Sequence, residues 1–336
     1  MTDLVPDPMS APPLRWGVLA PGGIAAKFVD NVSRFTAGQV VAVGSRDAGR
    51  AAKFAAEHSV ARSYGSYREL VEDPQVEAVY VASPHSEHRD HALLAIGAGK
   101  HVLVEKAFTV NAAQAEEVFD AARAAGVFAM EAMWTRHLPH VAALRAAIER
   151  GEIGDVVTLV ADHGQNMLAL PPTHRMHDPA LAGGALLDLG VYPVSFAHDL
   201  LGVPDEVVAL GSLTPAGVDG QVSIVLGHGG RAQASLHTTL RARTATTAVI
   251  SGTEGRIEVA GSFYGTTSFE VHRLDGTWWA WDRPVEGGFQ FQAAEVARRV
   301  ADGEAESPRM PWRGTVEVLR TMDEIRRQVG VRYPGE

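Results

Sequence analysis

The chain of 336 residues contains no cysteine. This absence excludes disulfide bonds, thiolate zinc sites and cysteine nucleophiles. Histidines are scattered along the chain, but none stands in HExxH or a similar ligand spacing, so we predict no catalytic metal. The start, MTDLVPDPMSAPP, lacks the continuous apolar segment of a secretory signal, and no apolar run approaches the roughly 18 residues of a membrane helix. We therefore expect a cytoplasmic protein with no membrane partner.

Positive charge is also scarce. The 30 lysines and arginines are outnumbered by 40 aspartates and glutamates, which gives a formal net charge of −10. Such a surface repels a phosphate backbone, and no basic stripe offsets it, so nucleic acid is not an expected partner. The hydrophobic fraction of 46% is that of a globular protein, and the length exceeds one ordinary core. We predict two domains.

The first part of the chain alternates β-like runs with alanine-rich amphipathic segments. The runs lie at residues 15–19, 40–43, 78–82, 101–104 and 127–132, with a helix at 112–125 and another at 138–150. This alternation predicts a parallel sheet covered by helices, a doubly wound α/β fold of the Rossmann type. We place a flexible tail at 1–13 and this dinucleotide-binding domain at 14–135.

The pattern changes after residue 154. Successive β-like runs follow one another at 156–162, 206–213, 221–226, 231–238, 245–251 and 268–272, with helices at 185–201, 290–301 and 315–329. Strands with few helices between them predict a largely antiparallel open sheet. The fold class is therefore a Rossmann domain followed by an α+β domain at 136–336, which would bind the substrate and form oligomers.

Residues 16–28, WGVLAPGGIAAKF, have the strand, tight turn and helix of the dinucleotide fingerprint GxGxxG/A. Ala20 stands where the first glycine belongs, and Gly22 takes the place of the second. We predict that Ala20, Gly22, Gly23 and Ile24 contact the cofactor phosphates. The alternative is an ordinary strand-to-helix turn.

The end of the next β-like run, VAVGSRD, indicates which cofactor is bound. NAD enzymes place an acid there on the ribose 2′-hydroxyl, but this chain has Ser45 and Arg46. A guanidinium can hold a 2′-phosphate with paired hydrogen bonds, so we predict NADP as the preferred cofactor and NAD as a possible one. The alternative is a surface arginine, with Asp47 capping the following helix.

Two further runs end in polar residues, in ASPHSEH at 82–88 and LVEKAF at 103–108. Ligands of doubly wound sheets bind outside the carboxyl ends of the strands, and Lys106 there would reach the reacting atom. The alternatives are a solvated loop lysine and histidines that serve as caps or satisfied core groups. The candidate cofactor contacts are Ser83, Pro84, His85, His88, Glu105 and Lys106.

The segment HDPALAGGALLDLGVYP at 177–193 places Asp188 and Tyr192 on one face of a predicted helix. A carboxylate and a phenol that point the same way can order a hydroxyl-bearing substrate. Pro193 complicates the helix, because proline kinks a helix interior. The alternative is that Tyr192 packs against the sheet with its hydroxyl satisfied.

These motifs, in this order, resemble the family of glucose-fructose oxidoreductase and inositol dehydrogenase, especially its dihydrodiol and sugar 1-dehydrogenases. WGVLAPGGIA resembles the family's nucleotide loop, GSRD its NADP-preferring variant, and AGKHVLVEKAF its Glu-Lys-Pro stretch with Ala107 in place of the proline. EAMWTRHLP resembles the crossing between domains, GGALLDLGVYP the active-site helix, and SPRMPWRGTVEVLRTMDEIRRQ the closing segment.

The resemblance implies that Lys106 and Tyr192 form the catalytic pair, with Asp188 beside them. It implies an NADP-dependent oxidoreductase that acts on a secondary carbinol or anomeric centre of a sugar, polyol or cyclic diol. Two alternatives remain, a non-catalytic nucleotide-binding regulator and a glycosidase that retains its nicotinamide. Candidates for lining the cofactor and substrate pocket are Trp134, Arg136, Arg175 and Phe289.

The predicted sheet of the second domain also indicates that the protein forms an oligomer. Helices cover one face of such a sheet, and the other face would leave apolar surface that monomers rarely expose. We expect a homodimer or homotetramer formed through that open face.

Overall fold

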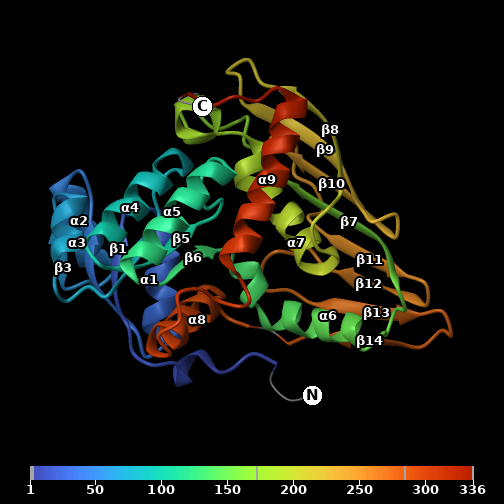
Figure 1. Cartoon of the computed structure of the whole chain (residues 1–336), viewed down its shortest axis with the longest axis horizontal. Coiled ribbons are helices and arrows are strands. Elements are labelled where there is room, and N and C mark those ends of the chain that lie inside the picture. Colours follow the sequence, from blue (N-terminus) through green and yellow to red (C-terminus); the bar gives the residue numbers. More distant parts are fainter. Residues whose placement is uncertain (1–3, 172, 284, 335–336) are drawn as a thin grey trace. The chain divides into compact units, whose positions relative to one another are not determined.

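The computed structural model describes residues 4–171, 173–283 and 285–334 (Figure 1). Contacts divide the chain into two units. One consists of Pro6–His137 with Gly287–Val316, and the other mainly of Leu138–Glu286 with Glu317–Glu336. This division differs from the expected continuous domain at 136–336, because the chain returns to the first unit near its end.

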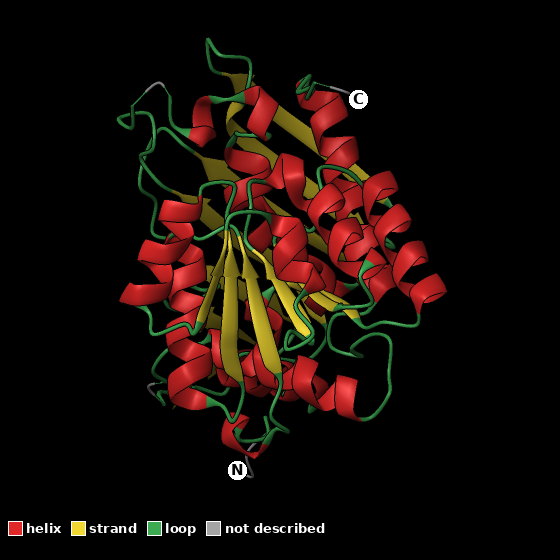
Figure 2. Cartoon of the chain, turned by 90° about the vertical axis from the view of Figure 1, so that its left-hand side faces the viewer, coloured by secondary structure: helices red, strands yellow, loops and turns green. Residues whose placement is uncertain are grey.

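The first unit contains a six-stranded parallel sheet with strand order β3-β2-β1-β4-β5-β6. Helices lie on both sides of it (Figure 2). The predicted Rossmann fold is confirmed, since this is its usual strand order. The elements are η1 Pro8–Ser10, β1 Arg15–Leu19, α1 Gly23–Phe35, β2 Gln39–Gly44, α2 Ala48–Glu57, β3 Arg62–Tyr64, α3 Tyr67–Glu72, β4 Ala78–Val81, η2 His85–Glu87, α4 His88–Gly97, β5 His101–Glu105, α5 Ala112–Ala125, β6 Ala129–Ala132, η3 Trp134–His137 and α8 Phe289–Ala301.

The segment expected to be a flexible tail makes contacts with a distant part of the chain. Asp7 caps the short helix η1, and the guanidinium of Arg298 donates to the Asp7 carbonyl at 2.7 Å and to the Ser10 hydroxyl at 3.2 Å. Ala11 and Leu14 are buried. A distant arginine thus supplies partners to residues 7–10 that the local sequence does not indicate, and the flexibility of the tail stays a prediction.

The returning segment 287–316 covers the edge strand β6. The Ala129 amide donates to the Ala305 carbonyl at 3.1 Å, and the Trp312 indole donates to the Ala129 carbonyl at 2.8 Å. The ring of Trp312 also stacks on Phe119, with centroids 5.3 Å apart. The edge of the sheet is thus satisfied by residues that come nearly 180 positions later in the chain.

The second unit contains an eight-stranded sheet with strand order β14-β13-β12-β11-β7-β10-β9-β8. Among the strand pairs of the described residues in this sheet, β7–β10 is the one parallel pair, so the predicted largely antiparallel sheet is confirmed. The elements are α6 Pro139–Glu149, β7 Val156–Gly164, η4 Arg175–His177, η5 Pro179–Leu181, the π-helix Leu186–Gly190, α7 Val191–Leu201, β8 Glu206–Leu213, β9 Asp219–His228, β10 Ala232–Thr239, β11 Ala248–Gly252, β12 Gly255–Val259, β13 Phe269–Arg273 and β14 Trp278–Trp281, followed by α9 Trp312–Val329, which belongs to this unit from Glu317 onward.

Helices cover one face of this sheet. The π-helix and α7 pack on β7 and β10, and inward residues of β9 such as Val222, Ile224 and Leu226 are buried. The helical stretch Pro179–Leu201 is long and apolar enough to cross a membrane, but 89% of its most apolar window is buried. Its apolar character is accounted for by this core position.

Candidate active site

The loop after β1 keeps the expected conformation despite its alanine. Ala20 has a φ of 70°, in the left-handed region that favours glycine. Gly22 precedes α1 in extended conformation with no side-chain cap, and a Cβ atom built at Gly22 or Gly23 would meet nothing within 4 Å. No described side chain or backbone therefore crowds the glycines at the start of this 13-residue helix, and this space fits the pyrophosphate of a dinucleotide.

The end of β2 gathers two arginines beside this loop. Asp47 caps α2, accepting from the Arg50 amide at 2.9 Å, and Arg46 lies exposed in front of that cap. The Arg50 guanidinium donates to the Pro21 carbonyl at 2.7 Å. Burial raises the pKa of Tyr67, while neighbouring Arg46 and Arg50 act in the opposite direction. Sequence reasoning missed Arg50, although it follows Arg46 by one helical turn.

The backbone around Lys106 is held from the neighbouring strand end. The Lys106–Ala107 peptide bond is cis. The Nε2 atom of His85 lies 3.2 Å from the Lys106 carbonyl, and Nδ1 of His88 lies 2.9 Å from the Ala107 carbonyl. The two predicted groups at the carboxyl ends of β4 and β5 therefore meet, with Lys106 at the centre.

The ring of His88 is buried, and both of its nitrogen atoms lie against backbone carbonyls. Its side chain is 1% exposed, and its Nε2 atom lies 2.8 Å from the Ser83 carbonyl. Burial lowers the pKa of His88 to about 4, so the neutral ring donates to one carbonyl at a time. This geometry matches the alternative of a satisfied core histidine and leaves no ring nitrogen for the cofactor. Ser83 is likewise buried, with its hydroxyl 2.9 Å from Nδ1 of His91.

Two buried carboxylates lie beneath the lysine loop. Glu105 accepts from the Tyr80 hydroxyl, and the Lys106 amide donates to it at 3.3 Å. Glu131 on β6 accepts from the Phe108 amide at 3.2 Å. Burial raises the pKa of Glu131 to about 7. Sequence reasoning missed Glu131, although a single carboxylate in a buried strand is an unusual feature.

Two predicted pocket residues lie together in the first unit. Trp134 and Phe289 stack with centroids 4.8 Å apart and an interplanar angle of 17°. Arg136 is 7% exposed and acts to lower the pKa of the Glu131 carboxyl, against the larger effect of burial. The stacked pair and Arg136 thus belong to the unit that carries Lys106.

Asp188 and Tyr192 lie in the second unit at a change of helix type. Asp188 is in the π-helix and Tyr192 in α7. In an α-helix the ring of Pro193 would clash with the Leu189 carbonyl, and the wider π-turn occurs at that point. The Leu189 carbonyl lies 3.1 Å from Nδ1 of His163. Pro193 is thus accommodated by a π-turn, where the sequence indicated a kink.

Tyr192 belongs to a cluster of three rings with Tyr264 and His163. Tyr192 is 8% exposed and stacks on Tyr264 at 4.3 Å, and Tyr264 stacks on His163 at 4.4 Å. The Asp188 carboxylate pairs with Arg175 at 3.1 Å. Stacking against neighbouring rings is part of the alternative that treats Tyr192 as structural. Sequence reasoning missed His163 and Tyr264, because β7 and the loop between β12 and β13, which are far apart in the sequence, bring them to Tyr192.

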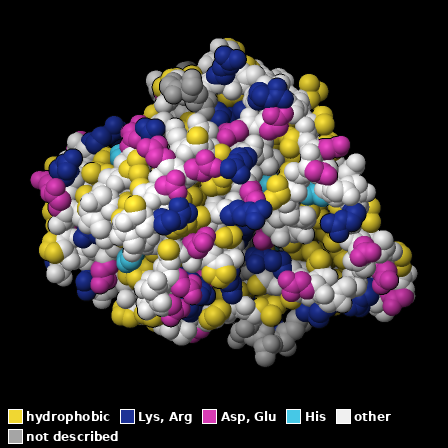
Figure 3. All heavy atoms as spheres, in the orientation of Figure 1, with side chains coloured by type: hydrophobic (Ala, Val, Ile, Leu, Met, Phe, Trp, Pro, Cys, Tyr) yellow, Lys and Arg dark blue, Asp and Glu magenta, His cyan; other side chains and the backbone are white. Residues whose placement is uncertain are grey.

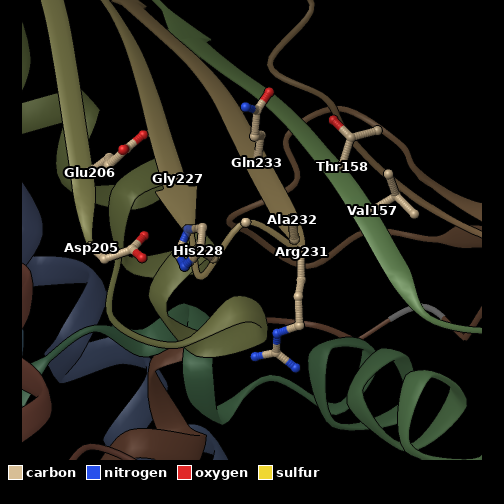
Figure 4. A pocket seen from close by; sticks show the side chains of 10 residues that line it. Val157, Thr158, Asp205, Glu206, Gly227, His228, Arg231, Ala232 and Gln233 are labelled. Carbon is tan, nitrogen blue, oxygen red and sulfur yellow. The ribbon is translucent and has the colours of Figure 1, made fainter.

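A surface pocket of about 320 Å³ lies elsewhere in the second unit, at the ends of β7 to β10 (Figure 4). Asp205, Glu206 and His228 line it, together with Arg231 and Gln233, and none of these was a predicted site residue.

On the face shown in Figure 3, basic and acidic side chains are interspersed. Among the described residues, no three histidine, aspartate or glutamate side chains form a metal-binding group.

Comparison with known families gives two matches. Residues 14–133 match "Oxidoreductase family, NAD-binding Rossmann fold" of the GFO/IDH/MocA group, and residues 141–258 match "GFO/IDH/MocA C-terminal domain".

Full-length relatives are similar as well. D-xylose 1-dehydrogenase (NADP(+)) of Hypocrea jecorina is 38% identical, over 96% of this chain and 93% of its own. Human trans-1,2-dihydrobenzene-1,2-diol dehydrogenase is 34% identical, over 96% and 99%. A 3-ketoreductase from Actinomadura kijaniata, solved with NADP and TDP-benzene, superposes with a TM-score of 0.85 at 27% identity, over 95% of this chain and 98% of its own.

Proposed function

The chain belongs to the GFO/IDH/MocA family of oxidoreductases, and from that premise we propose that it is an NADP-dependent dehydrogenase of sugars, polyols or cyclic diols. The observation that carries the proposal is the lysine loop at the end of β5, where His85 lies against the Lys106 carbonyl and Glu131 accepts from the Phe108 amide that follows it. Relatives named for a sugar substrate and for a dihydrodiol substrate support this substrate class.

Cofactor preference is proposed from the end of β2. Arg46 is exposed beside the phosphate loop, and Arg50 bridges the start of α2 to that loop. Two guanidinium groups favour a 2′-phosphate over a 2′-hydroxyl, because charged hydrogen bonds to phosphate are the stronger ones. The relative named for NADP and the ketoreductase solved with NADP support this choice.

The bound nicotinamide would accept or supply the hydride, and the protein would manage the proton. Oxidation of an alcohol requires its hydroxyl proton to leave, but a free phenol with a pKa of about 10 is a poor base at neutral pH. An ammonium group near the phenol stabilises the phenolate and lowers that pKa. We assign this proton transfer to Tyr192 assisted by Lys106, and the orientation of the substrate hydroxyl to Asp188.

The test is a screen of NADP reduction over aldoses, polyols and dihydrodiols, followed by kinetics of two variants. Tyr192→Phe and Lys106→Met should each lower kcat by about 10² to 10⁴-fold while NADP binding survives. The double variant should lose little more than the worse single variant, because the two groups act as one unit. Tyr64→Phe and Lys53→Met serve as matched controls.

Other outcomes would assign another function. Tight NADP binding without turnover of any substrate would indicate a nucleotide-binding regulator. Glycoside cleavage without release of NADPH would indicate a glycosidase that recycles its nicotinamide. Near-normal kcat in Tyr192→Phe would return that residue to a packing role and leave Lys106, with His85 or His177, as the proton carrier.

We also propose a homodimer formed through the open face of the eight-stranded sheet, with a tetramer as the alternative. Val208, Val225 and Val160 lie in one cross-strand row and are 64%, 41% and 50% exposed. Leu210 on β8 is 79% exposed. A second copy would cover this apolar row.

A cytoplasmic location remains part of the proposal, on the basis of the cysteine-free composition.

A further inference from the structure

A buried carboxylate from β9 holds the start of the helix that carries Asp188 and Tyr192. Asp219, the first residue of β9, is 0% exposed. Its Oδ2 atom accepts from the Leu186 amide at 2.6 Å. Hydrogen bonds from the backbone amides of Ala185 and Asp219 also favour the charged form of this carboxyl, because they lower its pKa. The first N–H groups of the helix therefore have an acceptor that is 33 residues away in the sequence.

The turn before the helix is shaped around this carboxylate. Gly184 has a φ of 116°, and a Cβ atom built there would lie 2.1 Å from Oδ1 of Asp219. At Gly183 a Cβ atom would lie 2.5 Å from the Arg175 carbonyl oxygen. The Tyr333 hydroxyl donates to the Gly183 carbonyl at 3.0 Å. Two glycines are thus required because backbone and carboxylate occupy the space of any side chain.

We propose that Asp219 is a positioning residue for the hydride transfer proposed above. By fixing the first helical turn, it fixes the rotation of the helix and hence the direction in which Asp188 and Tyr192 point. The inference rests on the proposed function, because positioning has a catalytic consequence only if those two side chains act on a substrate. Asp219 itself is fully buried, so its role in this proposal is to position other residues.

The charged groups around Asp219 determine which replacement preserves its role. Arg326 on α9 faces it and is paired with Asp323 at 2.7 Å, and Arg241 lies near the following Gly220. Burial raises the pKa of Asp219 to about 7, so both protonation states occur near neutral pH. Each state retains an oxygen that accepts the Leu186 N–H. Asparagine retains that acceptor too, and alanine does not.

The experiment compares Asp219→Ala with Asp219→Asn in the full-length protein. Asp219→Ala should lower kcat by about ten- to a hundredfold, because small displacements of reacting groups are costly. Its NADP dissociation constant should stay within about twofold of wild type, and Asp219→Asn should restore most of kcat. Asp205→Ala is the matched control, since Asp205 also accepts a backbone amide, that of Gly229 at 3.0 Å, but outside this helix.

Hydrogen exchange gives a second readout that does not depend on turnover. Peptides spanning residues 183–192 should exchange faster in Asp219→Ala, and Asp219→Asn should restore their protection. If Asp219→Ala does not fold, Asp219→Ser keeps a polar side chain but is too short to hold the same acceptor position, and it should lower kcat with NADP binding kept.

Three results would overturn the proposal: unchanged kcat per folded molecule in Asp219→Ala, equal losses in the alanine and asparagine variants, or unchanged exchange at the helix start. If wild type shows no turnover at all, the proposed function fails instead, and the exchange data still report whether Asp219 holds the helix.

Discussion

Replacing Glu131 with glutamine should make the stability of the dinucleotide-binding unit less dependent on pH. The Glu131 side chain is 1% exposed, and burial dominates the rise of its pKa to about 7. Arg136 and hydrogen bonds from Thr315 and Phe108 act in the opposite direction, and Glu105 adds to the rise. Glutamine keeps an oxygen for the Phe108 amide but carries no charge at any pH.

The sign follows from proton linkage. A carboxyl whose pKa is higher in the folded than in the unfolded chain stabilises the fold fully below about pH 4.5. That stabilisation is lost as the pH rises through about 7. Between pH 5 and pH 8 the loss from this group amounts to roughly 2 to 3 kcal/mol. Because Glu131 is almost fully buried, little of this effect is screened by solvent.

Urea denaturation at pH 5 and pH 8 measures the effect. Relative to wild type, Glu131→Gln should gain roughly 2 to 3 kcal/mol of unfolding free energy on going from pH 5 to pH 8. Glu57→Gln on the surface of α2 is the control and should show no such gain. An equal pH dependence in wild type and Glu131→Gln would refute the reasoning and indicate that the buried carboxyl does not titrate in this range.

Three other predictions concern the phosphate loop, the cofactor and the assembly. Arg46→Ala should weaken NADP binding by roughly ten- to a hundredfold and leave NAD binding nearly unchanged in calorimetry, and equal weakening of both would contradict the assignment. Ala20→Gly should raise the unfolding free energy by about 0.5–1 kcal/mol, because relief of the left-handed alanine exceeds the added chain entropy; a loss in urea denaturation would contradict this. Leu210→Glu on β8 should shift the protein toward monomer in light scattering, and Leu274→Glu, on the exposed turn between β13 and β14, should not. A wild-type protein that is monomeric at micromolar concentration would refute the dimer.

Local patterns predicted the long elements well. The helix at 112–125 and the strand at 206–213 match α5 and β8, because the helix has amphipathic periodicity with caps at Asn111 and Gly126 and the strand has alternating side chains. The sequence did not reveal β3, β12 and β14, which have three to five residues each. Strands this short carry too little alternation to be distinguished from loops, and their pairing depends on distant partners.

The site was predictable only where its residues follow a strand or helix directly. Lys106 and Ser45 could be placed because parallel strands end at the same edge of a sheet. Asp219 and Tyr264 could not, since their positions depend on the register of a mostly antiparallel sheet that local sequence does not encode. The π-turn at Asp188 also escaped prediction, although Pro193 marked the place where the helix is irregular.

The return of residues 287–316 to the first unit has a consequence during protein synthesis. The dinucleotide-binding unit cannot close its β6 edge until Trp312 has left the ribosome, long after His137 has done so. At typical elongation rates this delay is roughly 10 to 40 seconds, during which the edge strand is open to mispairing. We therefore expect nascent chains halted before residue 287 to recruit chaperones, and chains released after residue 316 to bind nucleotide.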